Sequence, residues 1–141
     1  MKASVMRIVV IFVALLASAC SSEQQATDPA SVIQDYYDKL NAGDLDGALA
    51  YVPEDAILFL RGVHSGKGQI TEFLRLEIGH NTRYELSDIE VDGSEVEYGL
   101  TIRSDEGIFR FGEFILDAVV EDGMLISNRI RVEAKNHKEA A

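Results

Sequence analysis

One stretch, from Val32 to Gly47, constrains the fold of this 141-residue chain more than any other. Asp28 stands before Pro29, and the pair marks a helix start, because an aspartate caps free backbone amides and proline suits the first turn. Asn41 and Gly43 tolerate the left-handed backbone with which a helix ends. Between these signals, apolar residues recur every three or four positions, which predicts one buried helix face. These residues are Val32, Ile33, Tyr36, Tyr37 and Leu40.

Two further helices are expected in the first half of the chain. Asp44 is placed to cap a short second helix that Pro53 closes. Its apolar residues are Leu45, Ala48, Leu49 and Tyr51. Lys67 and Gly68 lead into a third helix that Gly79 ends. The inner face of this third helix carries Ile70, Phe73, Leu74, Glu77 and Ile78.

A short apolar run, AILFL at 56–60, separates the second helix from the third. Acidic residues bound the run, which predicts a single strand covered on both faces. The next six residues, 61–66, include two glycines and are expected to form a turn.

From Thr82 onwards, apolar residues alternate with polar ones, which predicts a meander of four antiparallel strands. A phase slip near Ser87 and Asp88 indicates a bulge in the first of them. Asp92-Gly93 is a strong hairpin signal. Three N-terminal helices followed by this meander predict an α+β fold, with the helices packed on the concave face of a curved, cone-like antiparallel sheet.

The long strand expected from Ile108 to Val120 is apolar in both of its alternating sets of residues. One set faces the helices, and the other consists of Phe109, Phe111, Ile115 and Val119. An apolar patch left on the outer face of the sheet predicts a homodimer through that face. The last strand, Met124 to Val132, is expected to place on one face Ile126, Asn128, Ile130 and Val132.

The N-terminus has the pattern of a secretory signal: the basic residues Lys2 and Arg7, an apolar run, small residues at 17–19, and then Cys20. Cys20 is the only cysteine, so it cannot form an internal disulfide. The segment LLASAC resembles the lipobox of bacterial lipoproteins, which implies cleavage before Cys20 and its lipidation. The alternative is an ordinary signal peptide with a leftover thiol. The predicted units are a signal peptide (1–19), the acylated cysteine and a flexible tether (20–29), a folded domain (30–133) and a loose tail (134–141).

Lipidation of Cys20 predicts a membrane partner and a place in the bacterial cell envelope. Ser21 and Ser22 follow the cysteine, where an aspartate often retains such lipoproteins in the inner membrane, so the periplasmic side of the outer membrane is favoured. Without Lys2 and Arg7, 11 basic residues remain against 24 acidic ones, a net charge of −13 (11 − 24). This charge argues against nucleic acid as a partner.

No cofactor motif is present: the chain has neither a phosphate-binding loop nor a nucleophile elbow. Its histidines, His64, His80 and His137, do not have the spacing of metal ligands. The sequence therefore predicts neither a cofactor nor a metal.

The residues VIQDYYDKLNAGDLDGALAYVPEDAIL and HSGKGQITEFL resemble the nuclear transport factor 2-like superfamily, which includes the SnoaL-like polyketide cyclases and the ketosteroid isomerases. The resemblance implies a pocket between the helices and the concave sheet. It places the oxyanion-donor tyrosine of the isomerases on Tyr36, the general-base aspartate on Leu60 and the protonated aspartic acid on or beside Leu116. Because leucine transfers no proton, isomerase chemistry is not expected.

The leading prediction is a lipid-anchored, non-catalytic domain that binds a small apolar molecule or a partner segment. The expected pocket lining is Tyr36, Leu60, Tyr84, Tyr98, Leu116 and Asn128. A second hypothesis is an acid–base enzyme of the SnoaL-like type with His64 as general base, hydrogen-bonded to an acid that the sequence does not identify. A third is a structural envelope protein whose cone is filled by its own side chains.

Overall fold

The computed structural model describes residues 27–106 and 111–133. The predicted signal peptide, Cys20, most of the tether, Phe109 and the tail at 134–141 lie outside the described residues. The three expected helices are confirmed: α1 (Pro29–Asn41), α2 (Leu45–Leu49) and α3 (Lys67–Gly79).

The capping predictions for the first two helices are also confirmed. The Asp28 side chain accepts a hydrogen bond from the Ser31 amide at 3.0 Å, and Asp44 accepts one from the Gly47 amide at 2.9 Å. Gly43, between the two helices, has a φ of 74°, a left-handed backbone that glycine adopts at little cost. All five apolar residues predicted for the inner face of α1 are buried.

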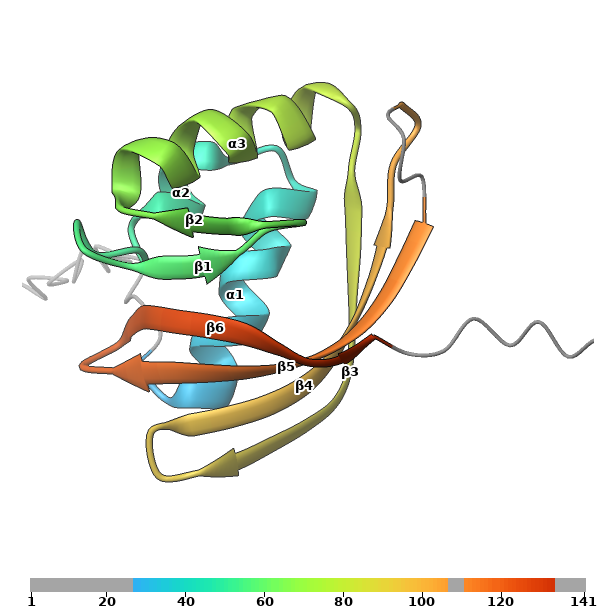
Figure 1. The fold of residues 1–141 in the computed structure, drawn as a ribbon. Helices are drawn as coiled ribbons and strands as arrows, with labels where there is room; N and C mark the ends of the chain where they lie inside the picture. The colour runs from blue at the N-terminus through green and yellow to red at the C-terminus, as the bar shows by residue number, and fades with distance from the viewer. Residues whose placement is uncertain (1–26, 107–110, 134–141) are drawn as a thin grey trace, which may run out of the picture.

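Six described strands form one curved sheet in the order β2-β1-β6-β5-β4-β3 (Figure 1). They are β1 (Ile57–Phe59), β2 (Val63–Ser65), β3 (Arg83–Asp92), β4 (Glu95–Arg103), β5 (Phe111–Glu121) and β6 (Met124–Glu133). The predicted four-strand meander is confirmed as β3–β6, with antiparallel pairing throughout.

Two predictions for the early strand region were wrong. Residues 61–66 are not only a turn, because Val63–Ser65 form β2 and pair with β1 in a hairpin. The β1 strand is also not covered on both faces, since Ile57 is 48% exposed. Its single pairing to the rest of the sheet is parallel, with Ile57 opposite Ser127 on β6, so the sheet is mixed.

Bulges set the faces of the longer strands. The predicted bulge is confirmed by a register shift between Ser87 and Glu90, with Asp88 at a φ of 49°. Two further shifts between β5 and β6, at Ile115/Leu116 and at Val119/Val120, were not predicted. Because a bulge moves the alternation by one residue, Leu125 is buried in place of the expected Ile126, which is half-buried.

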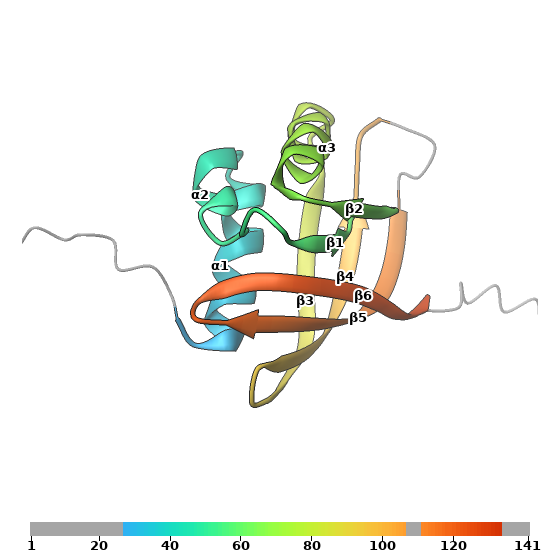
Figure 2. The same ribbon diagram turned by 60° about the vertical axis from the view of Figure 1, so that its left-hand side comes forward.

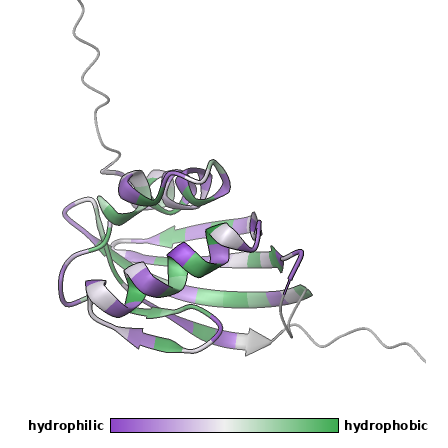
Figure 3. Cartoon of the chain, turned by 90° about the horizontal axis from the view of Figure 1, so that it is seen from above, coloured by the Kyte–Doolittle hydropathy of each residue, from purple (hydrophilic) through white to green (hydrophobic). Residues whose placement is uncertain are grey.

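The core lies between the concave face of the sheet and the helices. Helix α1 crosses this face and contacts β3, β4, β5 and β6, whereas α2 packs chiefly on α1 and α3. The turned view shows α1 beside the bent strands and α3 above β2 (Figure 2). Polar and apolar residues alternate along the elements (Figure 3). The buried residues of α1 and β4 are apolar.

The buried apolar side chains of the described core lie between Val32 and Leu125. No helix in the described ranges is long and apolar enough to cross a membrane.

Candidate functional site

A cluster of four tyrosines lies in the core, between α1 and the concave face of the sheet. Tyr36 and Tyr37 come from α1, Tyr84 from β3 and Tyr98 from β4, and all are at most 7% exposed. The Tyr37 ring joins the others, with centroid distances of 4.9 Å to Tyr36, 5.3 Å to Tyr84 and 5.9 Å to Tyr98. We call these four residues the tyrosine cluster. Their rings make an aromatic wall that carries hydroxyl groups inside the cone.

Tyr36 differs from the rest of the tyrosine cluster. Its side chain is fully buried, and no hydrogen-bond partner among the described residues reaches its hydroxyl. Buried hydroxyls are normally hydrogen-bonded, and leaving one unsatisfied costs about 1–3 kcal/mol. Burial raises the pKa of Tyr36 well above its ordinary value, and the nearby Tyr84 and Tyr98 add to this. The group is thus a protonated hydrogen-bond donor without an acceptor.

Tyr98 and Tyr37 satisfy one another. Their hydroxyl oxygens lie 3.1 Å apart, and the Asn128 amide donates to the Tyr98 oxygen at 3.4 Å. The other end of that amide, Oδ1, accepts from the backbone N–H of Phe59. Burial raises the pKa of Tyr98 to about 12, although its hydrogen bonds with Tyr37 and Asn128 oppose the rise. These partners hold the Tyr98 ring and bridge β1, β6, β4 and α1.

Tyr84 is held by the end of α1. The Asn41 amide donates to the Tyr84 carbonyl and accepts from the Tyr84 N–H, both at 2.8 Å. This side chain therefore hydrogen-bonds the edge of β3 as a neighbouring strand would. The Tyr84 hydroxyl donates to Glu77 Oε2 at 3.4 Å. Burial, and then the Glu77 charge, raise the pKa of Tyr84 well above its ordinary value.

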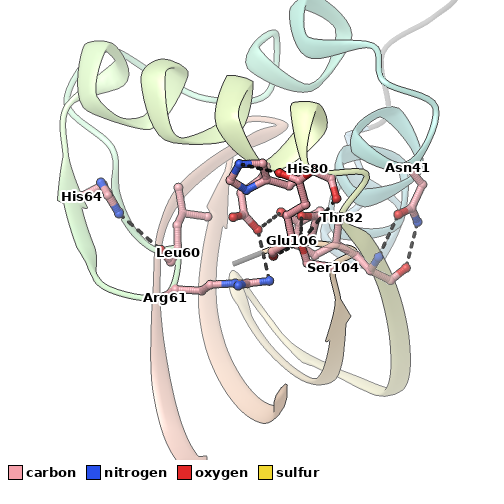
Figure 4. A network of polar contacts seen from close by, with 10 residues as sticks. Asn41, Leu60, Arg61, His64, His80, Thr82, Ser104 and Glu106 are labelled. Carbon is pink, nitrogen blue, oxygen red and sulfur yellow. Dashed lines mark hydrogen bonds and ion pairs between the residues drawn. The ribbon is translucent and has the colours of Figure 1, made fainter. Parts of the chain in front are cut away.

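A largely buried ion pair flanks the tyrosine cluster. Arg61, in the turn between β1 and β2, places a guanidinium nitrogen 3.4 Å from Glu77 Oε2, with side-chain exposures of 16% and 7%. Figure 4 shows Arg61 reaching from its turn toward the polar network that includes Thr82, Ser104 and the backbone carbonyl of His80. Arg61 has a φ of 56°, a left-handed backbone that costs a non-glycine residue about 1 kcal/mol or more.

The structure brings the sequence-predicted pocket residues into one core. Leu60 and Leu116 are 6% and 0% exposed, and Asn128 is 6% exposed. Leu60 and Leu116 lie with Tyr36, Tyr84 and Tyr98 in the apolar core. Asn128 joins this core through its hydrogen bond to the Tyr98 hydroxyl. Sequence reasoning missed Tyr37, Arg61 and Glu77 as parts of the site. The one available signal was Glu77, a charged residue on the buried face of α3.

His64 lies apart from this group. It belongs to β2 and not to a turn, with its Nε2 3.3 Å from the Leu60 carbonyl oxygen and its ring 4.6 Å from that of Phe73. Figure 4 shows it directed toward Leu60. Within the described ranges, no carboxylate hydrogen-bonds or ion-pairs with His64, and no group of three or more metal-binding side chains is found.

A hollow of about 720 Å³ lies on the outer face of the sheet. Charged residues line much of it: Arg129 pairs with Asp117 at 3.6 Å, and Arg131 pairs with Asp117 and Glu97. Phe111, on the same outer face, is 47% exposed and lies under the Arg103 guanidinium. The lining of this hollow is mixed, with apolar Ile57, Val91 and Val119 beside the charged residues, and none of the four tyrosines lines it, so it is not the pocket predicted inside the cone.

The architecture defines a class: an α+β cone in which a strongly bent sheet closes on an N-terminal helix. No protein-family model matches the sequence, and comparison with curated proteins finds no match. Solved structures do match. A nuclear transport factor 2-like protein of unknown function from Cytophaga hutchinsonii has a TM-score of 0.63 and 12% identity, covering 76% of this chain and 91% of that one.

Of two other similar structures, one is described by an activity and one by a bound compound. A candidate ketosteroid isomerase from Kribbella flavida has a TM-score of 0.59 and 16% identity, covering 71% of this chain and 73% of that one. A Mycobacterium tuberculosis protein in complex with estradiol-17beta-hemisuccinate has a TM-score of 0.64 and 14% identity, covering 77% of this chain and 96% of that one. At these identities the likeness shows the fold. The chain has the nuclear transport factor 2-like fold.

Proposed function

We propose that the domain binds a small, largely apolar molecule inside the cone and does not transform it. The observation that carries this proposal is the buried Tyr36 hydroxyl, which no described residue satisfies. A carbonyl or ether oxygen on the bound molecule would accept its hydrogen bond and offset the cost of burying it. The aromatic wall of the tyrosine cluster supplies the apolar contact.

Two further observations support binding over catalysis. Leu60 and Leu116 stand where the resemblance to isomerases implies acidic groups, and neither leucine transfers a proton. The Mycobacterium tuberculosis protein of the same fold holds a steroid ester, so a rigid, apolar, oxygen-bearing skeleton is the class of ligand that we propose for this chain.

The proposal includes the place where binding occurs. Cys20 follows a signal-like segment and the run LLASAC, and acyl chains on it would hold the domain at a bilayer. We therefore place the domain on the periplasmic side of the bacterial outer membrane. There it would take up or present a sparingly soluble molecule. The predicted homodimer through the outer sheet face remains a prediction.

The test begins with native mass spectrometry of residues 21–141 purified from the organism's own cells, which reports a retained molecule and the oligomeric state together. Titration calorimetry with androstenedione, a rigid apolar ketone, follows. Tyr36→Phe is expected to weaken this binding by about 2- to 10-fold, which corresponds to the free energy of one neutral hydrogen bond. Tyr51→Phe is the control, because the Tyr51 hydroxyl already donates to Asp35.

Equal androstenedione affinities of the wild type and Tyr36→Phe would show that the Tyr36 hydroxyl does not bind the ligand. A purified domain that retains no molecule and binds no ketone would refute ligand binding and favour a purely structural role.

A further inference from the structure

Acidic side chains stand opposite one another across three neighbouring strands on the outer face of the sheet. Glu90 on β3 is paired with Glu97 on β4, and Glu97 is paired in turn with Asp117 on β5. Two residues along the strands, Asp92 is paired with Glu95. Like charges directly opposite one another destabilise a sheet, so the stability of a single chain does not account for this arrangement.

The other end of the same row is basic. Asp117 is paired with Arg129 on β6, and their side chains lie 3.6 Å apart. Arg131, also on β6, contacts both Asp117 and Glu97. Both arginine side chains are more than half exposed, and a guanidinium has five N–H donors, so each retains donors for a partner. The row therefore runs from acidic at β3 to basic at β6.

The acids at the β3 end have no such contacts. Among the described residues, no base forms an ion pair with Glu90, Asp92 or Glu95. The lining of the hollow of about 720 Å³ includes these three acids and the two arginines of β6. It also includes Ile57 and Val91, each nearly half exposed. A partner on this face would cover apolar surface and meet charges of both signs.

The order of the charges makes this face complementary to itself. A two-fold axis that runs along the strands, in the interface between two copies and level with the gap between β4 and β5, places β3 of one copy over β6 of the other. Glu90 of each copy then faces Arg129 of the other copy, so the contact forms twice. In the middle of the row Glu97 faces Asp117, and in each copy Arg131 already lies against both of these carboxylates.

We infer that the outer face of the sheet binds a second copy of this chain, in the register that pairs Glu90 with Arg129 across the interface. The homodimer expected from the sequence rested on an apolar patch, whereas this register follows from the charged row and fixes which strands meet. A basic segment of another protein would be attracted by the acids and repelled by the two arginines. A second copy satisfies both ends of the row. Dimerisation through this face does not require a ligand in the cone.

Charge reversal at the two ends of the row tests this register. Sedimentation equilibrium of residues 21–141 in about 50 mM salt, where screening is weak, is expected to show a dimer. Arg129→Glu and Glu90→Arg should each raise the dimer Kd by about tenfold or more, because each turns two attractive contacts into repulsive ones. The double variant restores opposite charges across the interface, so its Kd should return to within about threefold of the wild-type value.

The controls make the same changes of charge away from this face. Arg75→Glu and Glu72→Arg, at exposed positions of α3, should change the dimer Kd by less than about twofold. Circular dichroism establishes that each variant is folded. If a reversal variant does not fold, Arg129→Gln and Glu90→Gln take its place, and each should raise the Kd by about threefold because an attraction is lost without a repulsion.

Three results would overturn the inference. A wild-type chain that stays monomeric at about 1 mM would show that the face does not bind a second copy. A dimer whose Kd neither reversal changes would place the interface elsewhere. A folded double variant that dimerises no more tightly than the two single variants would refute the pairing of Glu90 with Arg129.

Discussion

Removing the Tyr36 hydroxyl is the most direct test of the site, because it should stabilise the ligand-free protein and weaken ligand binding. In the structure this hydroxyl is fully buried and lacks a partner among the described residues. Tyr36→Phe deletes the unsatisfied group and keeps the ring and its contact with Tyr37. An unsatisfied buried hydroxyl costs about 1–3 kcal/mol, part of which the lost dispersion contacts offset. We expect a gain of about 1 kcal/mol in the free energy of unfolding.

The matched comparison is Tyr98→Phe, which removes a hydroxyl from the same cluster. Here the hydroxyl has two partners, and its loss leaves both Tyr37 and Asn128 without a contact that they now make. The expected result is a loss of about 1–3 kcal/mol. The two variants are chemically identical substitutions with opposite expected signs.

Urea denaturation of ligand-free residues 21–141, followed by circular dichroism, measures both values. For a domain of about this size, 1 kcal/mol corresponds to a shift of roughly 4 °C in Tm, so thermal melts provide a second reading. A loss of 1 kcal/mol or more in ligand-free Tyr36→Phe would mean that the hydroxyl has a partner. The reasoning behind the binding site would then fail.

Three other predictions follow from the described contacts. Arg61→Ala leaves the buried Glu77 charge without its ion-pair partner and should lower the free energy of unfolding by about 2–3 kcal/mol. The control is Arg129→Ala, because the Arg129 side chain is 81% exposed and its loss should change the free energy of unfolding by at most about 0.5 kcal/mol. Equal effects of the two variants in urea denaturation would contradict the burial of the Arg61–Glu77 pair. Burial raises the pKa of Tyr98 to about 12, so above pH ~10 the unfolded state loses this proton first and stability should fall as pH rises toward 12, by up to about 1.4 kcal/mol per pH unit per tyrosine. Denaturation at pH 8 to 11, with a spectrophotometric tyrosinate titration, checks this, and normal titration of all tyrosines near pH ~10 in the folded protein would oppose it. Finally, labelled palmitate should be incorporated by the wild type and not by Cys20→Ala, and equal labelling of the two would rule out the lipid anchor.

Part of the site was predictable from the sequence and part was not. Tyr36, Tyr84, Tyr98 and Asn128 were placed inside by helical spacing and strand alternation, because a period of 3.6 or 2 determines which side chains share a face. The same patterns treat Glu77 as one member of a helix face and Arg61 as a turn residue. Neither pattern shows that these two side chains meet, since they lie on different elements.

The sequence by itself determined the local structure: the caps at Asp28 and Asp44, the three helices, the bulge near Asp88 and the antiparallel meander. These features depend on residues a few positions apart. Only the tertiary structure decided that β2 forms, that β1 joins β6 in parallel, and that Leu125 replaces Ile126 in the core. It alone decided which tyrosine lacks a partner, because Tyr98 finds Asn128 30 residues away while Tyr36 finds no described acceptor. Hydrogen-bond satisfaction inside a core is set by contacts between distant segments, and periodicity does not encode them.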